Sequence, residues 1–88
     1  MRRKEDFLLQ DVGGERLLVP LGAQVMNLNG LIVLNQTAAY TWALLAEERT
    51  LDELCAAVAE RFDVAPDTAR DDVGAFVDEI VHLGLLEQ

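Results

Sequence analysis

The chain has 88 residues, of which 51% are hydrophobic, and its formal net charge is −9 at pH 7. This length allows one domain with one modest core, and it is too short for a deep active-site cleft between two lobes. Only seven residues are Lys or Arg, so the chain lacks the clustered positive charge with which proteins bind nucleic acids.

The N-terminal third of the chain is predicted to form antiparallel strands after a flexible basic tail over residues 1–6. The strands are expected at about residues 7–12, 15–20, 24–28 and 31–34. Gly13-Gly14 is typical of the two-residue turn that joins the first two, and Asn29-Gly30 favours the positive φ angles of a type I′ turn in a second hairpin. The sheet therefore has three or four strands, depending on whether residues 24–28 are regular.

Three amphipathic helices are predicted after the strands, over residues of about 36–46, 51–62 and 66–83. Asn35 can cap the first helix, and Thr50 with Glu53 has the spacing of a capping box at the second. Pro66 fits the first position of the third helix, and Gly84 can end it. The expected fold is α+β and winged helix-turn-helix-like, with the antiparallel sheet before the helices in a single domain over residues 1–88.

The strand over residues 31–34 is apolar at every position. Leu34 adjoins the start of the first helix and is placed inward, so Ile32 also faces inward, while Leu31 and Val33 face the other way. Exposed edge strands normally carry charge, proline or a bulge, and this one carries none of them. We therefore expect another segment to cover it.

The residue types needed for catalysis are scarce. The chain has no serine, one histidine, His82, and one cysteine, Cys55, which lie on different predicted helices with no third residue to orient them. Cys55 is expected to pack in the core. Asp71, Asp72, Asp78 and Glu79 form a solvated acidic face, without the companions that a zinc or calcium site requires. We predict no enzyme activity, no metal and no cofactor.

The helix over residues 66–83 also argues against binding to DNA. In a winged helix-turn-helix this helix enters the major groove. Here it carries five carboxylates and one arginine, Arg70, so it would repel phosphates at close range.

The sequence is expected to belong to a cytoplasmic protein. It has no apolar run of the roughly 18 residues that a membrane span needs, and no apolar segment follows the basic start as in a secretory signal. The single cysteine agrees with a reducing compartment.

An ordered set of short motifs resembles the PqqD family of small peptide-binding domains, also called RiPP recognition elements. The resemblance covers nearly the whole chain. The motifs are Leu-Asn-Gln-Thr-Ala-Ala-Tyr-Thr-Trp-Ala-Leu-Leu at residues 34–45, Thr-Leu-Asp-Glu-Leu at 50–54, Phe-Asp-Val at 62–64, Asp72-Val73, Phe76-Val77 and Gly84-Leu85-Leu86. The sequence departs from many relatives at Ala39, where they have glycine, and Asn27-Leu28-Asn29-Gly30 is a feature of one branch of stand-alone relatives.

The resemblance implies a non-catalytic domain that captures the leader segment of a ribosomally synthesised precursor peptide. The domain then presents the leader to a modifying enzyme, commonly a radical S-adenosylmethionine maturase. In the family the leader adds as a strand to the last strand of the sheet, in a groove walled by the third helix. On this sequence the resemblance implies these peptide-binding residues: Leu31, Ile32, Val33, Leu34, Asp72, Phe76 and Glu79. For Ile32 and Leu34 the backbone is expected to bind, and for Phe76 plain core packing is an equal alternative.

Two other functions stay open. In the first, the domain is a structural subunit that self-associates by pairing its exposed strand with that of a second copy. The leader-binding domain is instead expected to be a monomer or a weak homodimer. An enzyme built on Cys55 and His82 is the second alternative.

Overall fold

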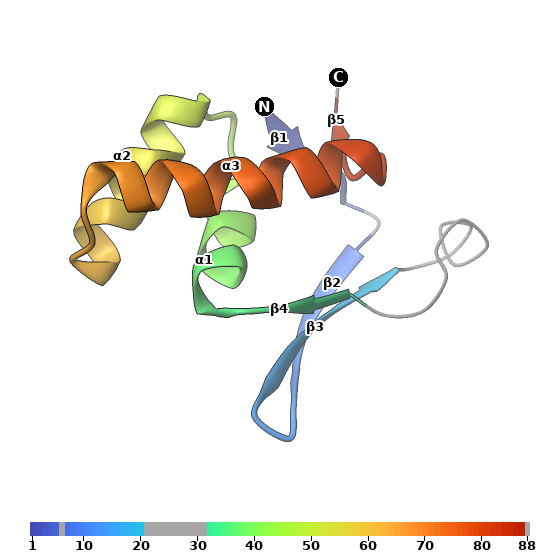
Figure 1. Cartoon of the computed structure of the whole chain (residues 1–88). Helices are drawn as coiled ribbons and strands as arrows, with labels where there is room; N and C mark the ends of the chain where they lie inside the picture. Colours follow the sequence, from blue (N-terminus) through green and yellow to red (C-terminus); the bar gives the residue numbers. More distant parts are fainter. Residues whose placement is uncertain (6, 21–31, 88) are drawn as a thin grey trace.

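The computed structural model describes residues 1–5, 7–20 and 32–87 (Figure 1). Along the chain the elements are β1 (Arg2–Arg3), β2 (Phe7–Val12), β3 (Glu15–Pro20), β4 (Ile32–Leu34), α1 (Gln36–Leu44), α2 (Leu51–Phe62), α3 (Pro66–His82) and β5 (Leu86–Glu87). Strands followed by three helices confirm the predicted α+β fold. The strand predicted at residues 24–28, the turn at Asn29-Gly30 and Leu31 lie outside the described residues.

The predicted signals at the helix ends are present. The side chain of Asn35 accepts a hydrogen bond of 2.8 Å from the amide of Ala38 at the start of α1. At α2, the Thr50 hydroxyl accepts from the Glu53 amide and the Glu53 carboxylate accepts from the Thr50 amide, which completes the capping box. Helix α1 ends two residues earlier than predicted, because its last turn tightens: the amide of Ala46 donates to the carbonyl of Ala43. Helix α3 ends one residue earlier, at His82.

The described strands form two antiparallel sheets. A three-stranded sheet has the order β2-β3-β4, and a two-stranded sheet pairs β1 with β5. In the first, Val12 pairs with Glu15 across the Gly13-Gly14 turn, and Leu17 pairs with both Gln10 of β2 and Val33 of β4. Strand β3 is therefore the central strand, and β4 continues almost directly into α1.

The prediction of a flexible tail over residues 1–6 is wrong for residues 1–5, which are the part of that segment that the structure describes. Arg3 donates its amide to the carbonyl of Leu45 and its guanidinium to the carbonyl of Trp42, at 2.9 and 3.1 Å. The amide of Lys4 donates to the carbonyl of Leu85 at 2.9 Å. Carbonyls at the C-terminal end of a helix lack their regular helical partners. Here the Leu45 carbonyl accepts from the Arg3 amide, and the Trp42 carbonyl accepts from the Arg3 guanidinium as well as from the Leu45 amide at 3.2 Å. This pairing orders the segment.

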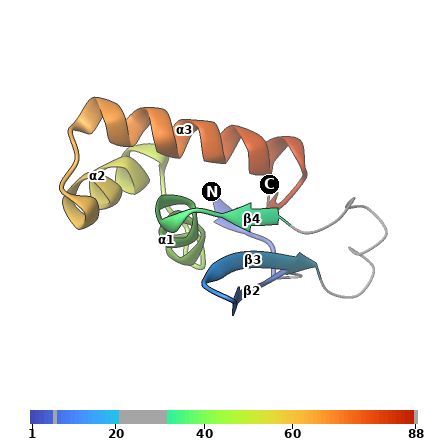
Figure 2. The same cartoon turned by 60° about the horizontal axis from the view of Figure 1, so that its bottom comes forward.

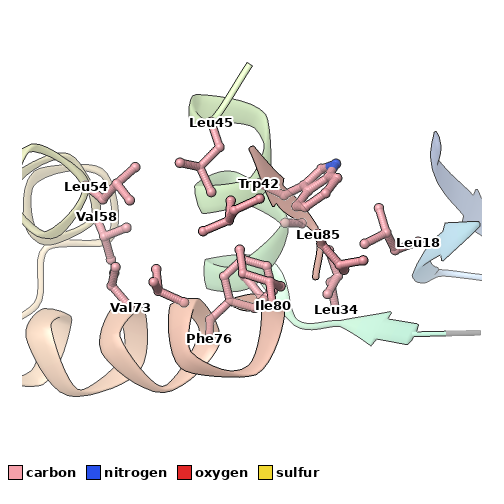
Figure 3. Close-up of a cluster of buried hydrophobic side chains, with 14 of the residues drawn as sticks. Leu18, Leu34, Trp42, Leu45, Leu54, Val58, Val73, Phe76, Ile80 and Leu85 are labelled. Atoms are coloured by element: carbon pink, nitrogen blue, oxygen red, sulfur yellow. The ribbon is translucent and has the colours of Figure 1, made fainter. Parts of the chain in front are cut away.

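The core lies where α1 meets α3 and the inner face of the sheet (Figure 3). Trp42 of α1 is fully buried, and the Phe7 ring meets it edge to face with centroids 6.2 Å apart. Phe76 and Ile80 of α3 point toward α1, while Leu18 of β3 closes the core from the sheet side. Packing of α1 against both α3 and the sheet fixes the position of α3 relative to β4.

Candidate functional site

Strand β4 is an edge strand whose second edge has no described partner. Within the described residues it pairs only with β3, through Ile32, Val33 and Leu34. Figure 2 shows that the other edge of β4 faces α3, so β4 lies between α3 and the rest of the sheet. A row of backbone groups on such an edge can pair with an additional strand.

The register shows which backbone groups of β4 face this open edge. Gly13 and Gly14 have φ angles of 60° and 85°, as in a type I′ turn, which makes the flanking residues Val12 and Glu15 a hydrogen-bonded pair. Hydrogen-bonded and non-hydrogen-bonded pairs alternate along antiparallel strands, and each residue of the central strand β3 directs its amide and carbonyl to one neighbour only. Glu15 faces β2, so the next residue, Arg16, faces β4.

The same alternation continues across β4. Arg16 is paired with Leu34, and Leu18 is paired with Ile32, so Leu34 and Ile32 direct their backbone groups toward β3. Val33 has the opposite phase and directs its amide and carbonyl toward the open edge. The predicted backbone role therefore falls to Val33, because the sheet already uses the groups of Ile32 and Leu34.

The side chains of β4 follow the predicted alternation. Leu34 is 5% exposed and packs in the core, and Ile32 is half-buried on the same face. Val33 is 61% exposed on the opposite face. These orientations match the prediction for all three residues, and Leu31 lies outside the described part of the chain.

A groove of about 240 Å³ lies between β4, the start of α1 and α3. It brings together five of the predicted site residues: Val33, Leu34, Asp72, Phe76 and Glu79. The last three share one face of α3 because they are four and three residues apart. Phe76 is only 7% exposed, so its ring forms the floor of the groove and also belongs to the core.

Sequence reasoning missed the lining residues Asn35, Thr37, Ala38 and Ala75. Ala75 was detectable, because it lies three residues after Asp72 on the same helical face. The residues at the start of α1 line the groove because the chain turns sharply from β4 into the helix. The direction of that turn cannot be predicted from hydrophobic periodicity.

The groove is acidic at its rim. Asp72 and Glu79 are exposed, and neither forms an ion pair with any described residue. Their charges are therefore available to a basic or amide-bearing group on a bound molecule.

The described residues offer little for catalysis. They contain no cluster of three or more His, Cys, Asp or Glu side chains that could hold a metal ion. Cys55 is buried in the core, as predicted, and His82 is exposed at the end of α3. None of the helices in the described ranges is long and apolar enough to cross a membrane.

Comparison with known proteins agrees with this geometry. A search of curated proteins found no match. Among solved structures, the chain is similar to "TbiB1 in Complex with the TbiA(beta) Leader Peptide", with a TM-score of 0.72 and 21% sequence identity over 99% of this chain and 95% of that one. At this level of identity the similarity establishes a shared fold. The profile of the family described as "Coenzyme PQQ synthesis protein D (PqqD)" matches residues 22–86, and the chain therefore belongs to the PqqD family.

Proposed function

We propose that this domain binds the leader segment of a ribosomally synthesised precursor peptide and presents it to a modifying enzyme, of the radical S-adenosylmethionine type or another maturase. The leader adds as a strand to the open edge of β4, in the groove beside α3. Membership of the PqqD family supports this role, as does the similar fold of TbiB1, whose structure holds a leader peptide. In this proposal the domain is a single non-catalytic unit.

The observation that carries the proposal is that the amide and carbonyl of Val33 face away from β3, at the edge of the groove, and have no partner among the described strands. Its amide and carbonyl can form two hydrogen bonds with one residue of an added strand, each contributing about 0.5–1.5 kcal/mol net. Such bonds barely depend on the peptide sequence. Selectivity must therefore come from the side chains along the groove.

The dimensions of the groove set the length of peptide that it reads. Asp72 and Glu79 are seven residues apart on α3, or about 10.5 Å along the helix axis. Three strand residues span about 10 Å. The acidic rim thus runs beside about three peptide residues, with apolar contact available from Phe76 and a basic or amide group placed to meet Asp72 or Glu79.

Amide chemical shifts of the ¹⁵N-labelled domain, titrated with the leader encoded by the neighbouring precursor gene, test the proposal. We expect the largest shifts at Val33, Asp72, Phe76 and Glu79, and small ones on the exposed face of α2 around Asp52. A scrambled leader is the control. Shifts of equal size on α2, or equal binding of the scrambled peptide, would contradict the proposed site.

The open edge also supports a second candidate function, self-association. The second edge of β4, which has no partner among the described residues, can pair with the same edge of a second copy, beside the exposed Val33. Light scattering over a range of concentrations separates the two functions. A dimer that the leader dissociates supports peptide binding, whereas a stable dimer that no leader affects supports a structural role.

A further inference from the structure

A second depression lies on the other side of α1 from the groove. It has a volume of about 350 Å³, and we call it the arginine pocket, after Arg16 and Arg61, which line it with Tyr40 and Phe62. The groove is lined by Thr37 and Ala38 of α1, and the arginine pocket by Gln36, Ala39 and Tyr40. Successive helical residues are 100° apart, so these two sets face opposite sides of the first turn.

The arginine pocket carries positive charge that the domain leaves largely free. The Arg61 guanidinium lies over the rings of Phe62 and Tyr40, 5.3 and 5.9 Å from their centroids, and it forms no ion pair with any described carboxylate. Arg16 has one ion pair, with the exposed Asp11 at 3.9 Å. Both arginines line this one pocket, although the chain as a whole has a formal charge of −9.

The aromatic rings also prepare Arg61 for binding. The rings of Tyr40 and Phe62 meet edge to face, with centroids 5.6 Å apart, and form a wall that holds the guanidinium. A guanidinium packed on an aromatic face keeps its edge of N–H donors free, and this edge matches a carboxylate in two parallel hydrogen bonds. The pocket therefore suits a planar anion.

The groove and the arginine pocket are connected. A third depression, along the turn from β4 into α1, shares Val33, Leu34 and Asn35 with the groove, and it shares Arg16 and Gln36 with the arginine pocket. Arg16 is the direct cross-strand partner of Leu34, with about 5.5 Å between the two Cα atoms of this hydrogen-bonded pair. A strand added to the other edge of β4 lies about two strand spacings, or roughly 10 Å, from β3. A peptide paired with β4 needs only a few further residues to reach Arg16.

We propose that the arginine pocket binds an aspartate or glutamate side chain of the captured peptide, in the part of the peptide that leaves β4 beyond Leu34. This inference rests on the proposed function. The groove end of the path carries Asp72 and Glu79, and the connecting depression carries Asp11 and Glu15 beside Arg16. At the far end, Arg61 is a cation that pairs with no described carboxylate. Backbone pairing with one residue of β4 fixes neither the direction nor the register of a peptide, and this charge difference fixes both.

Selection of peptides on the whole domain tests the inference without knowledge of the natural leader. Random dodecapeptides displayed on phage are selected against the wild-type domain and against Arg61→Gln. We expect the wild-type pool to combine an extended apolar segment with an acidic residue at a constant interval on one flank. The pool from Arg61→Gln should keep the apolar segment and lose the acidic preference.

Titration calorimetry with one selected peptide measures how much Arg61 and the peptide's acidic residue contribute to its affinity. Arg61→Gln, or replacement of the peptide's acidic residue by its amide, should each weaken binding about two- to fivefold, and the two changes together should weaken it little more than one of them alone. Arg61→Lys keeps the positive charge but lacks the planar guanidinium that forms two parallel hydrogen bonds. Its Kd should therefore lie between those of the wild type and Arg61→Gln. Arg70→Gln is the matched control, because Arg70 is an exposed arginine outside the pocket, paired with Asp52 at 2.9 Å. Thermal melts verify folding, and Arg16→Gln replaces Arg61→Gln if the latter is unstable.

The outcomes separate the two proposals. A wild-type pool with apolar segments but no acidic preference would overturn this inference and leave the proposed function standing. The same holds if the acidic preference survives both arginine substitutions. A failure to enrich any peptide on the wild-type domain would overturn the proposed function, and this inference with it.

Discussion

The assignment of the Val33 amide to the open edge of β4 makes Val33→Pro a test of the mechanism. Proline removes the amide hydrogen and is tolerated on edge strands where that hydrogen does not enter the ladder. According to the register, no hydrogen bond to β3 is lost. The free energy of unfolding should therefore change by less than about 0.5 kcal/mol, as for other surface substitutions.

Peptide binding should respond differently. The substitution deletes one backbone hydrogen bond to the added strand, worth about 0.5–1.5 kcal/mol, so the Kd should rise by about two- to tenfold. Titration calorimetry with the leader peptide measures this change. Val33→Thr is the matched control, because threonine keeps both the amide and the β-branched shape.

Ile32→Pro tests the opposite orientation, in which the backbone amide points toward the neighbouring strand. Its amide faces β3, so proline there breaks the ladder and should lower the melting temperature by about 4 °C or more, which is the shift expected for 1 kcal/mol in a domain of this size. If Val33→Pro lowers the melting temperature as much as Ile32→Pro does, the assigned phase of β4 is wrong. If Val33→Pro leaves both the melting temperature and the Kd unchanged, strand addition at this edge is refuted.

Three further predictions concern charge, capping and the core. Asp72→Asn should weaken binding of a leader that carries a basic residue by up to about fivefold, and calorimetry at increasing salt should show the difference between variant and wild type shrink. Thr50→Ala should lower the free energy of unfolding by about 1 kcal/mol in urea titrations, because it removes the cap of α2. The Thr50 backbone amide, and after it the Thr50 side chain, hold the pKa of Glu53 below its ordinary value of 4.5. The resulting stabilisation is fully present above that pH and is lost as the pH falls through the lowered pKa. Thr50→Ala keeps the amide and loses only the side-chain contribution, so its urea titrations should show a slightly weaker decline in acid than those of the wild type. Trp42→Ala should cost about 3–5 kcal/mol, followed by far-ultraviolet circular dichroism because the only tryptophan is lost, and a cost below 1 kcal/mol would contradict its burial.

The sequence predicted the parts of the fold that depend on local signals. Gly13-Gly14 located the first hairpin with both strands at their observed bounds, and Thr50 with Glu53 located the start of α2. Strands β1 and β5 were missed, because two residues carry no periodic pattern and their partner lies at the opposite end of the chain.

For the candidate site, the sequence predicted which way the side chains of β4 face, but it did not predict which way their backbone amides point. Alternation gave the inward face of Leu34 and the outward face of Val33, whereas the direction of the Val33 amide required the register of all three strands. The arginine pocket was not foreseen. Arg16 and Arg61 belong to elements far apart in sequence, and only the packing of α1 brings them together.

The pairing of β1 with β5 has a consequence for how this domain can be engineered. Arg2 lies opposite Glu87, so the two ends of the chain leave the molecule side by side. A short linker can close the polypeptide into a ring, and new ends can be opened at the exposed Gly13-Gly14 turn with the three-stranded sheet still intact in space. The domain can also be inserted into a surface loop of a host protein through a single point of attachment.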